Sequence, residues 1–159
     1  MSIKLKRLSS YNHLEARDVY VDAIQSQSDS LYSQEQITAW SELAWLPGVL
    51  DRPLSEGMGW AVVEDEKIVA FASRHPSNRL ALLYCRGCHG RQGYATALID
   101  RVEKDAVEAG EDQLITEASL FSYSLLMRCG WILKDTEKIQ IGGVDFERYL
   151  MAKKIVESK

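Results

Sequence analysis

Residues 83–99 read Leu83-Tyr84-Cys85-Arg86-Gly87-Cys88-His89-Gly90-Arg91-Gln92-Gly93-Tyr94-Ala95-Thr96-Ala97-Leu98-Ile99. The order of residue types predicts the end of a strand, a glycine-rich turn and the start of a helix. The first turn of a helix has N–H groups without intrahelical partners and a positive dipole, so it stabilises a phosphate or another anion. Gly93 and Ala95 would let phosphates approach the backbone, and Arg91 adds a positive charge. This stretch therefore predicts an anion-binding turn.

Glycine in such a turn is weak support by itself, because many strand-to-helix turns favour it. The glycines stand at positions 87, 90 and 93, which does not match the Gly-x-Gly-x-x-Gly pattern of dinucleotide-binding domains. The stretch also lacks the Gly-Lys-Ser/Thr of a P-loop. The flanking sequence therefore has to show which kind of fold holds the turn.

Hydrophobic periodicity predicts the elements upstream of the turn. They are a strand over 3–8, a helix over 11–28, a helix from the capping box Ser33-Gln34-Glu35-Gln36, and strands over 60–63, 68–72 and 80–85. Turn residues between the three later strands indicate an antiparallel meander. Pro47-Gly48 and Pro53 interrupt the pattern, so we expect residues 46–57 to form a loop.

Downstream, the turn opens an amphipathic helix that ends at Gly110 and buries one apolar face, namely Ala97, Leu98, Val102, Ala106 and Val107. The later elements are a strand over 113–116, a helix over 119–129, a strand from Trp131, a Gly142-Gly143 hairpin and a last strand to Met151. The predicted order is β-α-α-β-β-β-α-β-α-β-β. This order is typical of an α+β (mixed α/β) fold in a single domain over 1–159.

Composition limits the classes of function. The chain has 159 residues, a net charge of −4 and a pI near 5.4, so it lacks the basic surface of a nucleic-acid-binding protein. The sequence contains no apolar run long enough to cross a membrane, and we expect its basic N-terminal stretch to form a strand rather than a signal peptide. Three cysteines do not make a disulfide framework in a chain of this size, and we expect a cytoplasmic protein.

Cys85-Arg86-Gly87-Cys88-His89 matches the attachment pattern of c-type haem. Haem attachment requires export, and the pattern lies across a predicted strand end and the anion-binding turn. A zinc site needs four ligands, and the remaining cysteine and histidines show no paired spacing. We therefore expect neither haem nor metal, and interpret Cys85 as a strand residue.

With these elements in place, residues 83–99 resemble motif A of the GNAT superfamily of acyl-CoA-dependent N-acetyltransferases, Gln/Arg-x-x-Gly-x-Gly/Ala. Gly93 and Ala95 match its last two positions, whereas Gly90 departs from the first. The resemblance extends over nearly the whole chain. It includes Thr116-Glu117-Ala118-Ser119, Met127-Arg128-Cys129-Gly130-Trp131 and, in the helix 2 region, Tyr32-Ser33-Gln34-Glu35-Gln36-Ile37 with Ala39-Trp40.

The resemblance implies a mostly antiparallel central sheet that is splayed between strands 4 and 5, with acetyl-CoA bound in the splay. It implies coenzyme contacts from Leu83, Tyr84, Cys85, Gly90, Arg91, Gln92, Gly93, Tyr94, Ala95, Thr96 and Ser119. The acetyl group would pass directly to a primary amine of a small molecule or protein within a ternary complex. A homodimer is compatible with this interpretation.

The catalytic groups are less clear from the sequence. Many relatives place an acidic tyrosine at the position of Leu126, and Tyr123 lies about one helical turn before it. Tyr123 could protonate the thiolate or simply pack, and water could serve as the acid instead. Glu117 is the nearest candidate for a general base, with a structural acceptor as the alternative. Ser119 could contact the coenzyme or cap a helix.

We expect the acceptor amine to bind near Tyr32, Trp40 and His75. Two other functions remain open from the sequence. Because Gly90 and Leu126 depart from the family pattern, the chain could be an inactive acyl-CoA-binding or sensing module. It could also be an unrelated nucleotide-binding domain, in which case ATP or NAD would raise its thermal stability and CoA would not.

Overall fold

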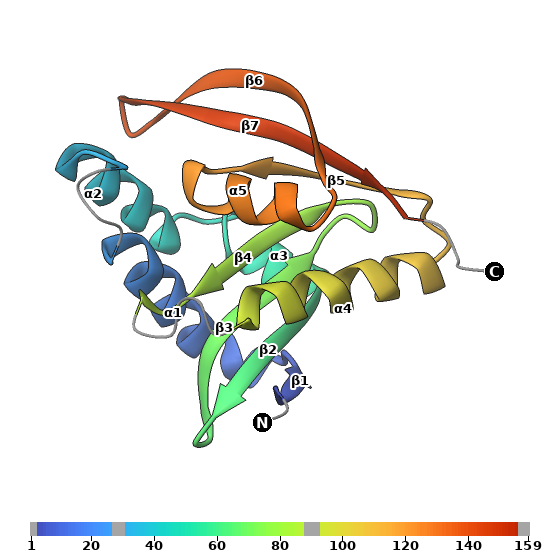
Figure 1. The fold of residues 1–159 in the computed structure, drawn as a ribbon. Helices are drawn as coiled ribbons and strands as arrows, with labels where there is room; N and C mark the ends of the chain where they lie inside the picture. The colour runs from blue at the N-terminus through green and yellow to red at the C-terminus, as the bar shows by residue number, and fades with distance from the viewer. Residues whose placement is uncertain (1–2, 27–30, 88–92, 156–159) are drawn as a thin grey trace.

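The computed structural model describes residues 3–26, 31–87 and 93–155 (Figure 1). The strands are β1 Leu5–Arg7, β2 Met58–Glu64, β3 Lys67–Arg74, β4 Leu80–Cys85, β5 Gln113–Ala118, β6 Ile132–Ile141 and β7 Val144–Lys154. The helices are α1 His13–Gln25, α2 Gln34–Glu42, α3 Asp51–Glu56, α4 Tyr94–Glu108 and α5 Leu120–Arg128, with 3-10 turns η1 Ser10–Asn12 and η2 Leu43–Trp45.

The first sheet has the strand order β1-β2-β3-β4, and every neighbouring pair in it is antiparallel. β3 lies in the middle and is buried over almost its whole length. Helix α1 packs on one face of β3 and helix α4 on the other, so successive side chains meet apolar neighbours on both sides. This explains why β3 contains a continuous run of apolar residues. A strand with one solvent-exposed face would instead alternate apolar and polar residues.

The second sheet has the order β5-β7-β6 and is also antiparallel. The two sheets meet where Arg79 and Ile115 form an isolated parallel bridge, beside a hydrogen bond from the Ile115 amide to the Asn78 carbonyl. Beyond this point β4 and β5 diverge, and in Figure 1 α5 lies between β4 and the β6–β7 hairpin, in contact with β5, β6 and β7. The predicted mixed, mostly antiparallel fold with a splay between strands 4 and 5 is confirmed.

Two apolar cores flank the first sheet. One contains the inner face of α4 with β5, α5 and Trp131, and the other contains α1, α2 and the facing side of β3 and β4. The buried α4 residues are Leu98, Ile99, Val102 and Ala106. Ala97 and Val107 were predicted to be inside but are only partly buried, so the buried stripe is rotated slightly toward Ile99.

The predicted loop over 46–57 was wrong in its second half, where α3 forms. Pro53 is the third residue of this helix, in the first turn, where its missing N–H removes no intrahelical hydrogen bond. The Ser73 hydroxyl donates to the Pro53 carbonyl at 2.7 Å, which ties α3 to β3. Tertiary contact therefore stabilises a short helix that its own sequence does not favour.

Candidate functional site

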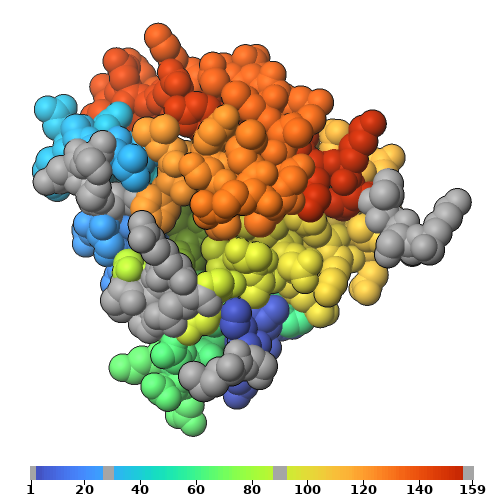
Figure 2. Space-filling view, viewed as in Figure 1, coloured from blue at the N-terminus to red at the C-terminus, as the bar shows by residue number. Residues whose placement is uncertain are grey.

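A pocket of about 550 Å³ opens at the splay between β4 and β5. Its wall includes residues of α1, α2, α3, β4, β5, α5 and the β6–β7 hairpin. Figure 2 shows the surface of β4 recessed between the orange atoms of α5 and the yellow atoms of α4. The volume lies in the range of sites that bind small molecules.

The structure brings together many residues that the sequence analysis selected. Those that line the pocket are Tyr32, Trp40, His75, Leu83, Tyr84, Glu117 and Ser119. The predicted acceptor residues therefore share one cavity with the candidate base and with part of the expected coenzyme wall. They come from segments as far apart in the chain as the start of α2 and the start of α5.

Other selected residues lie elsewhere. Cys85 ends β4, and Gly93, Tyr94, Ala95 and Thr96 form the start of α4, outside the pocket lining. Gly90, Arg91 and Gln92, and with them Cys88 and His89, lie outside the described residues.

The α5 candidates differ in their surroundings. Tyr123 is partly buried, and its ring packs on Tyr149 with centroids 4.9 Å apart. Leu126 is buried and lines the pocket, as does Ser122. Leu126, where the resemblance led us to expect an acidic tyrosine in relatives, therefore presents a hydrocarbon surface to the cavity.

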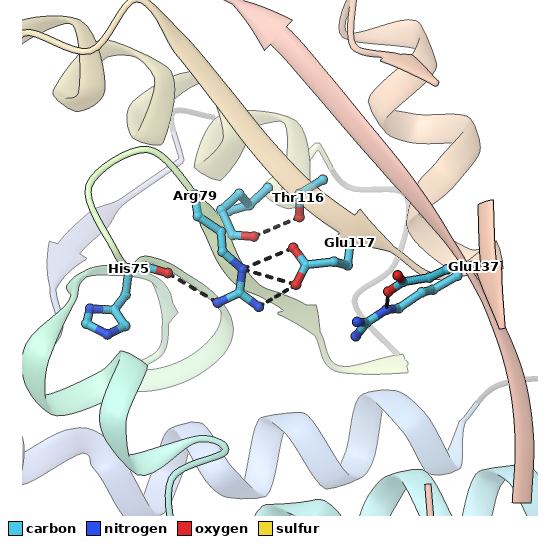
Figure 3. A network of polar contacts seen from close by, with 7 residues as sticks. His75, Arg79, Thr116, Glu117 and Glu137 are labelled. Carbon is cyan, nitrogen blue, oxygen red and sulfur yellow. Dashed lines mark hydrogen bonds and ion pairs between the residues drawn. The ribbon is translucent and has the colours of Figure 1, made fainter. Parts of the chain in front are cut away.

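Glu117 is held by an arginine that the sequence analysis did not select (Figure 3). The Arg79 Nη2 atom donates to Glu117 Oε1 at 2.7 Å, and Arg79 Nε donates to Oε2 at 3.0 Å. Arg79 Nη1 also donates to the carbonyl oxygen of His75 at 3.3 Å. Bidentate, charge-assisted pairs of this kind fix the orientation of a carboxylate. The sequence did not reveal this ion pair because its partners are 38 residues apart. Arg79 directly precedes β4 and Glu117 lies in β5, and these strands belong to different sheets.

A second ion pair lies in the same wall of the pocket. Arg148 of β7 donates through Nε to Glu137, which is its cross-strand partner on β6. Arg148 lines the cavity, as do Phe146 and Glu147. The hairpin therefore contributes both charged and apolar surface to the pocket.

Aromatic rings form much of the remaining wall. Tyr32 and Trp40 pack edge-to-face with centroids 5.2 Å apart, and Phe146 lies 6.3 Å from each of them. The Tyr32 hydroxyl accepts a hydrogen bond from the Leu120 amide at 2.8 Å, which joins the segment before α2 to α5. The Tyr20 hydroxyl donates to the Trp40 carbonyl at 2.8 Å. The rings are thus fixed by polar contacts as well as by packing.

Burial changes the acidity of three tyrosines in this wall. Loss of water around the ionised form raises the pKa of Tyr84 to about 12, despite an opposing hydrogen bond with Trp40. The same cause raises the pKa of Tyr20, and it raises that of Tyr32 against the hydrogen bonds from Leu120 and Ser119. All three phenols are therefore neutral around the pocket at physiological pH.

The start of α4 has features that favour an anion. Gly93 is its N-cap residue with φ of +80°, a left-handed conformation that favours glycine. The first turn of α4 contains no acidic residue. Among the described residues, β4 pairs with β3 along one edge and meets β5 only at the Arg79–Ile115 bridge. The facing edge of β4 near Leu83 can therefore accept an extended ligand arm.

Helix α1 supports the segment that leads into this turn. The Gly87 amide donates to Asp22 Oδ1 at 3.0 Å, and Arg86 forms ion pairs with Asp22 and Asp18. An added Cβ on Gly87 would lie 2.3 Å from the Ser26 Cβ atom. Close packing against the end of α1 therefore requires glycine at position 87.

Two further observations concern metals and membranes. Within residues 3–26, 31–87 and 93–155, no three His, Cys, Asp or Glu side chains gather as a metal site would require. No helix in this described part of the chain is long and apolar enough to span a bilayer.

Comparison with known proteins gives one family match. The model of the acetyltransferase (GNAT) domain matches residues 28–153. No protein of curated function matches the chain.

Solved structures with the same fold are numerous. A GCN5-related N-acetyltransferase from Rhodopseudomonas palustris, also described as a class-II aminotransferase, has a TM-score of 0.91 and 23% identity, over 97% of this chain and 96% of the other. The PaiA N-acetyltransferase of Thermoplasma acidophilum, in complex with coenzyme A, has a TM-score of 0.74 and 19% identity, over 97% and 99% of the two chains. The ribosomal-protein-S18-alanine N-acetyltransferase of Escherichia coli has a TM-score of 0.67 and 13% identity, over 99% and 97%. At these identities the likeness shows the fold.

Proposed function

Because the chain belongs to the acetyltransferase (GNAT) domain family, we propose that it transfers an acetyl group from acetyl-CoA to a primary amine. The acceptor would be a small molecule or a protein amine, bound together with acetyl-CoA in a ternary complex. The observation that carries the proposal is the pocket at the splay, where Glu117 lies in one cavity with Tyr32, Trp40 and residues of β4.

For the coenzyme, we propose that the pyrophosphate binds at the start of α4 through backbone N–H groups, including those of Ala95 and Thr96. Support comes from the helix N-terminus, from the left-handed Gly93 and from the absence of an acidic residue in the first turn of α4. The pantetheine arm would lie along the edge of β4 that faces β5, beside Leu83 and Tyr84, and would reach the pocket near Ser119.

For the chemistry, we propose that Glu117 takes the proton of the acceptor amine. Its side chain is 22% exposed and lines the pocket, so an amine can reach it. Replacement of Glu117 by Gln keeps the shape of the side chain and removes the basic oxygen. We expect kcat to fall by about a hundredfold or more, which is the usual contribution of a general base.

The acid that protonates the leaving thiolate stays a proposal based on position alone. Tyr123 carries the phenol nearest in the chain to Leu126, although its ring packs on Tyr149. The Tyr123→Phe variant keeps this packing and removes the hydroxyl. A fall of about tenfold or more in kcat would support an acid role, and an unchanged kcat would assign Tyr123 to packing.

The deciding experiment measures thiol release from acetyl-CoA with a panel of primary amines, together with coenzyme affinity by calorimetry. Turnover with any amine supports the transferase. Tight binding of coenzyme without turnover supports the acyl-CoA-binding module instead, which the hydrocarbon surface of Leu126 in the pocket favours.

Placement of the coenzyme can be tested with two matched glycine variants. Gly93 and Gly110 stand before and after α4, both with left-handed φ of +80° and +90°, and both have room for a Cβ. Aspartate at either position costs similar backbone strain, about 1 kcal/mol. Only Gly93→Asp puts a negative charge at the proposed phosphate site, so it should weaken acetyl-CoA binding at least about tenfold relative to Gly110→Asp. Equal affinity in the two variants would contradict the placement.

A further inference from the structure

The contacts of Arg79 leave one oxygen of Glu117 more open than the other. Oε1 accepts from Arg79 Nη2 at 2.7 Å, and the single Nε–H is shared between Oε2 at 3.0 Å and Oε1 at 3.2 Å. Among the described residues, this shared N–H is the only donor to Oε2. A carboxylate oxygen can accept two hydrogen bonds. Because Oε1 faces both Nη2 and the shared Nε–H, whereas Oε2 faces the shared Nε–H alone, Oε2 has the greater remaining capacity to accept a proton or a hydrogen bond.

Arg79 is itself fixed by the backbone around it. Its Nη1 atom donates to the His75 carbonyl at 3.3 Å, and the Arg79 backbone forms the parallel bridge to Ile115. Next to it, the Thr116 hydroxyl donates to the Leu80 carbonyl at 2.7 Å. The guanidinium therefore stands in the short region where β4 and β5 are joined, close to where they diverge around the pocket (Figure 3).

We propose that Arg79 is a positioning residue that holds the Glu117 carboxylate with Oε2 available to the acceptor amine; this rests on the transferase function proposed above. In the reaction, the amine nitrogen forms a bond to the thioester carbon of acetyl-CoA and the carbon–sulfur bond breaks. The nitrogen loses one proton to Oε2, and the departing sulfur gains one proton. The products are an amide and the free thiol, and Glu117 ends in its original ionised state once its proton has passed on to the sulfur or to solvent.

A purely structural role for the ion pair would give different kinetics. If Arg79 and Glu117 only hold β4 and β5 together, any oppositely charged pair at these positions should keep both the stability and the activity of the protein. Exchange of the two residues, Arg79→Glu with Glu117→Arg, restores an ion pair but moves the carboxylate from β5 to the residue that precedes β4. A structural tie would survive the exchange, whereas a positioned base would be lost.

The test compares Arg79→Met, Arg79→Lys and the exchanged pair by urea unfolding, by kcat and by the KM for acetyl-CoA. We expect Arg79→Met to lower kcat by about ten- to a hundredfold with little change in KM for acetyl-CoA, because the base is misplaced while the coenzyme site is intact. Arg79→Lys keeps the charge but not the bidentate geometry, so its kcat should lie in between. The exchanged pair should regain the urea midpoint lost in Arg79→Met but not the activity.

A matched control is the exposed pair Lys104 and Asp100 on α4, whose exchange should change neither stability nor kcat. Recovery of wild-type kcat in the exchanged Arg79–Glu117 pair would overturn the inference, as would an Arg79→Met variant that folds and turns over like the wild type. If Arg79→Met fails to fold, Arg79→Lys provides the test. A wild-type kcat in Arg79→Lys would also overturn the inference, because lysine cannot hold the carboxylate in bidentate geometry. A wild-type protein that binds acetyl-CoA and acetylates no amine would overturn the proposed function, and the inference with it.

Discussion

At the scale of single residues, Ser119 illustrates how one side chain can have two roles. Its hydroxyl accepts from the Ser122 amide at 3.3 Å, and the Ser122 hydroxyl accepts from the Ser119 amide at 3.2 Å, so it is the N-cap of α5. It also lines the pocket, where the proposed coenzyme arm would pass. The cap that the sequence left as an alternative is present, and the coenzyme contact stays a prediction.

Substitution of Ser119 separates the two roles. Ser119→Ala should lower the free energy of unfolding by about 1 kcal/mol, and Ser119→Gly by only a few tenths, because glycine is tolerated at an N-cap. Both variants lack the hydroxyl, so a coenzyme hydrogen bond would show as the same rise in the acetyl-CoA Kd in both, about fivefold. Urea unfolding and calorimetry measure the two effects. An unchanged Kd in both variants would leave Ser119 as a cap only.

Gly87 shows the effect of close packing on one residue. A Cβ at this position would lie 2.3 Å from the Ser26 Cβ and 2.4 Å from its Oγ, so the end of α1 and the segment before the turn would have to move apart. We expect Gly87→Ala to destabilise the protein by about 1–3 kcal/mol and to raise the KM for acetyl-CoA.

A second-site substitution tests this explanation. The double variant Gly87→Ala with Ser26→Gly removes the clashing side chain and should regain most of the lost stability. The double-mutant cycle, measured by urea unfolding, should give a coupling energy of about 1 kcal/mol or more. Additive effects of the two substitutions would rule out the clash as the cause.

At the scale of elements, the hairpin between β2 and β3 has an unfavourable turn sequence. Asp65 and Glu66 both adopt positive φ, 51° and 65°, which is the conformation of a two-residue type I′ turn. Asn-Gly is the favoured pair for this turn, and a glutamate at the second position carries strain. The sequence analysis expected a turn here but not its type, because Asp-Glu does not indicate a left-handed conformation.

Relief of this strain should stabilise the protein. Glu66→Gly is expected to raise the free energy of unfolding by about 0.5–1 kcal/mol, since glycine adopts the native φ without cost and the turn faces solvent. Chemical unfolding measures the gain, and Glu66→Ala serves as the control, because alanine removes the charge but keeps the Cβ. Equal stabilisation in both variants would point to charge repulsion with Glu64 and Asp65 as the cause.

At the scale of the whole molecule, the tyrosines of the pocket link folding to alkaline pH. Tyr20, Tyr32 and Tyr84 all have a pKa raised by burial, in Tyr84 to about 12, while an unfolded tyrosine titrates near 10. Above about pH 10 the unfolded chain therefore binds fewer protons than the folded protein, and stability falls as pH rises. The stabilisation is complete below pH 10 and is lost as the pH rises toward the folded pKa values.

This linkage predicts a flat urea midpoint up to about pH 9 and a steep decline above about pH 10. Tyr20→Phe should make the decline shallower, because one fewer phenol ionises on unfolding, although it loses the hydrogen bond to Trp40 and about 1 kcal/mol at neutral pH. Absorbance of tyrosinate during alkaline titration follows the same event. An unchanged slope in Tyr20→Phe would exclude Tyr20 from the linkage.

Much of the fold could be predicted from local patterns. The spacing of apolar residues in α1 and α4, the capping box at Ser33 and the glycine at position 93 each depend on neighbours within one or two helical turns. These features indicated the order of the main elements, a turn expected to bind an anion, and a resemblance to GNAT enzymes. The family match confirms the resemblance, and the role of the turn stays a prediction. Helix α3 was missed because contact with β3, rather than its own sequence, stabilises it.

Sequence alone thus determined the main elements other than α3, and it indicated where the proposed coenzyme turn would lie, because those features depend on short-range periodicity and backbone conformation. Only the tertiary structure decided which side chains share the pocket. Arg79 meets Glu117 across 38 residues, Tyr32 meets Leu120 across 88, and Gln36 meets the carbonyl of Asp145 across 109. Such contacts depend on how the two sheets diverge and on how helices pack against them, and no local pattern in the chain records that geometry.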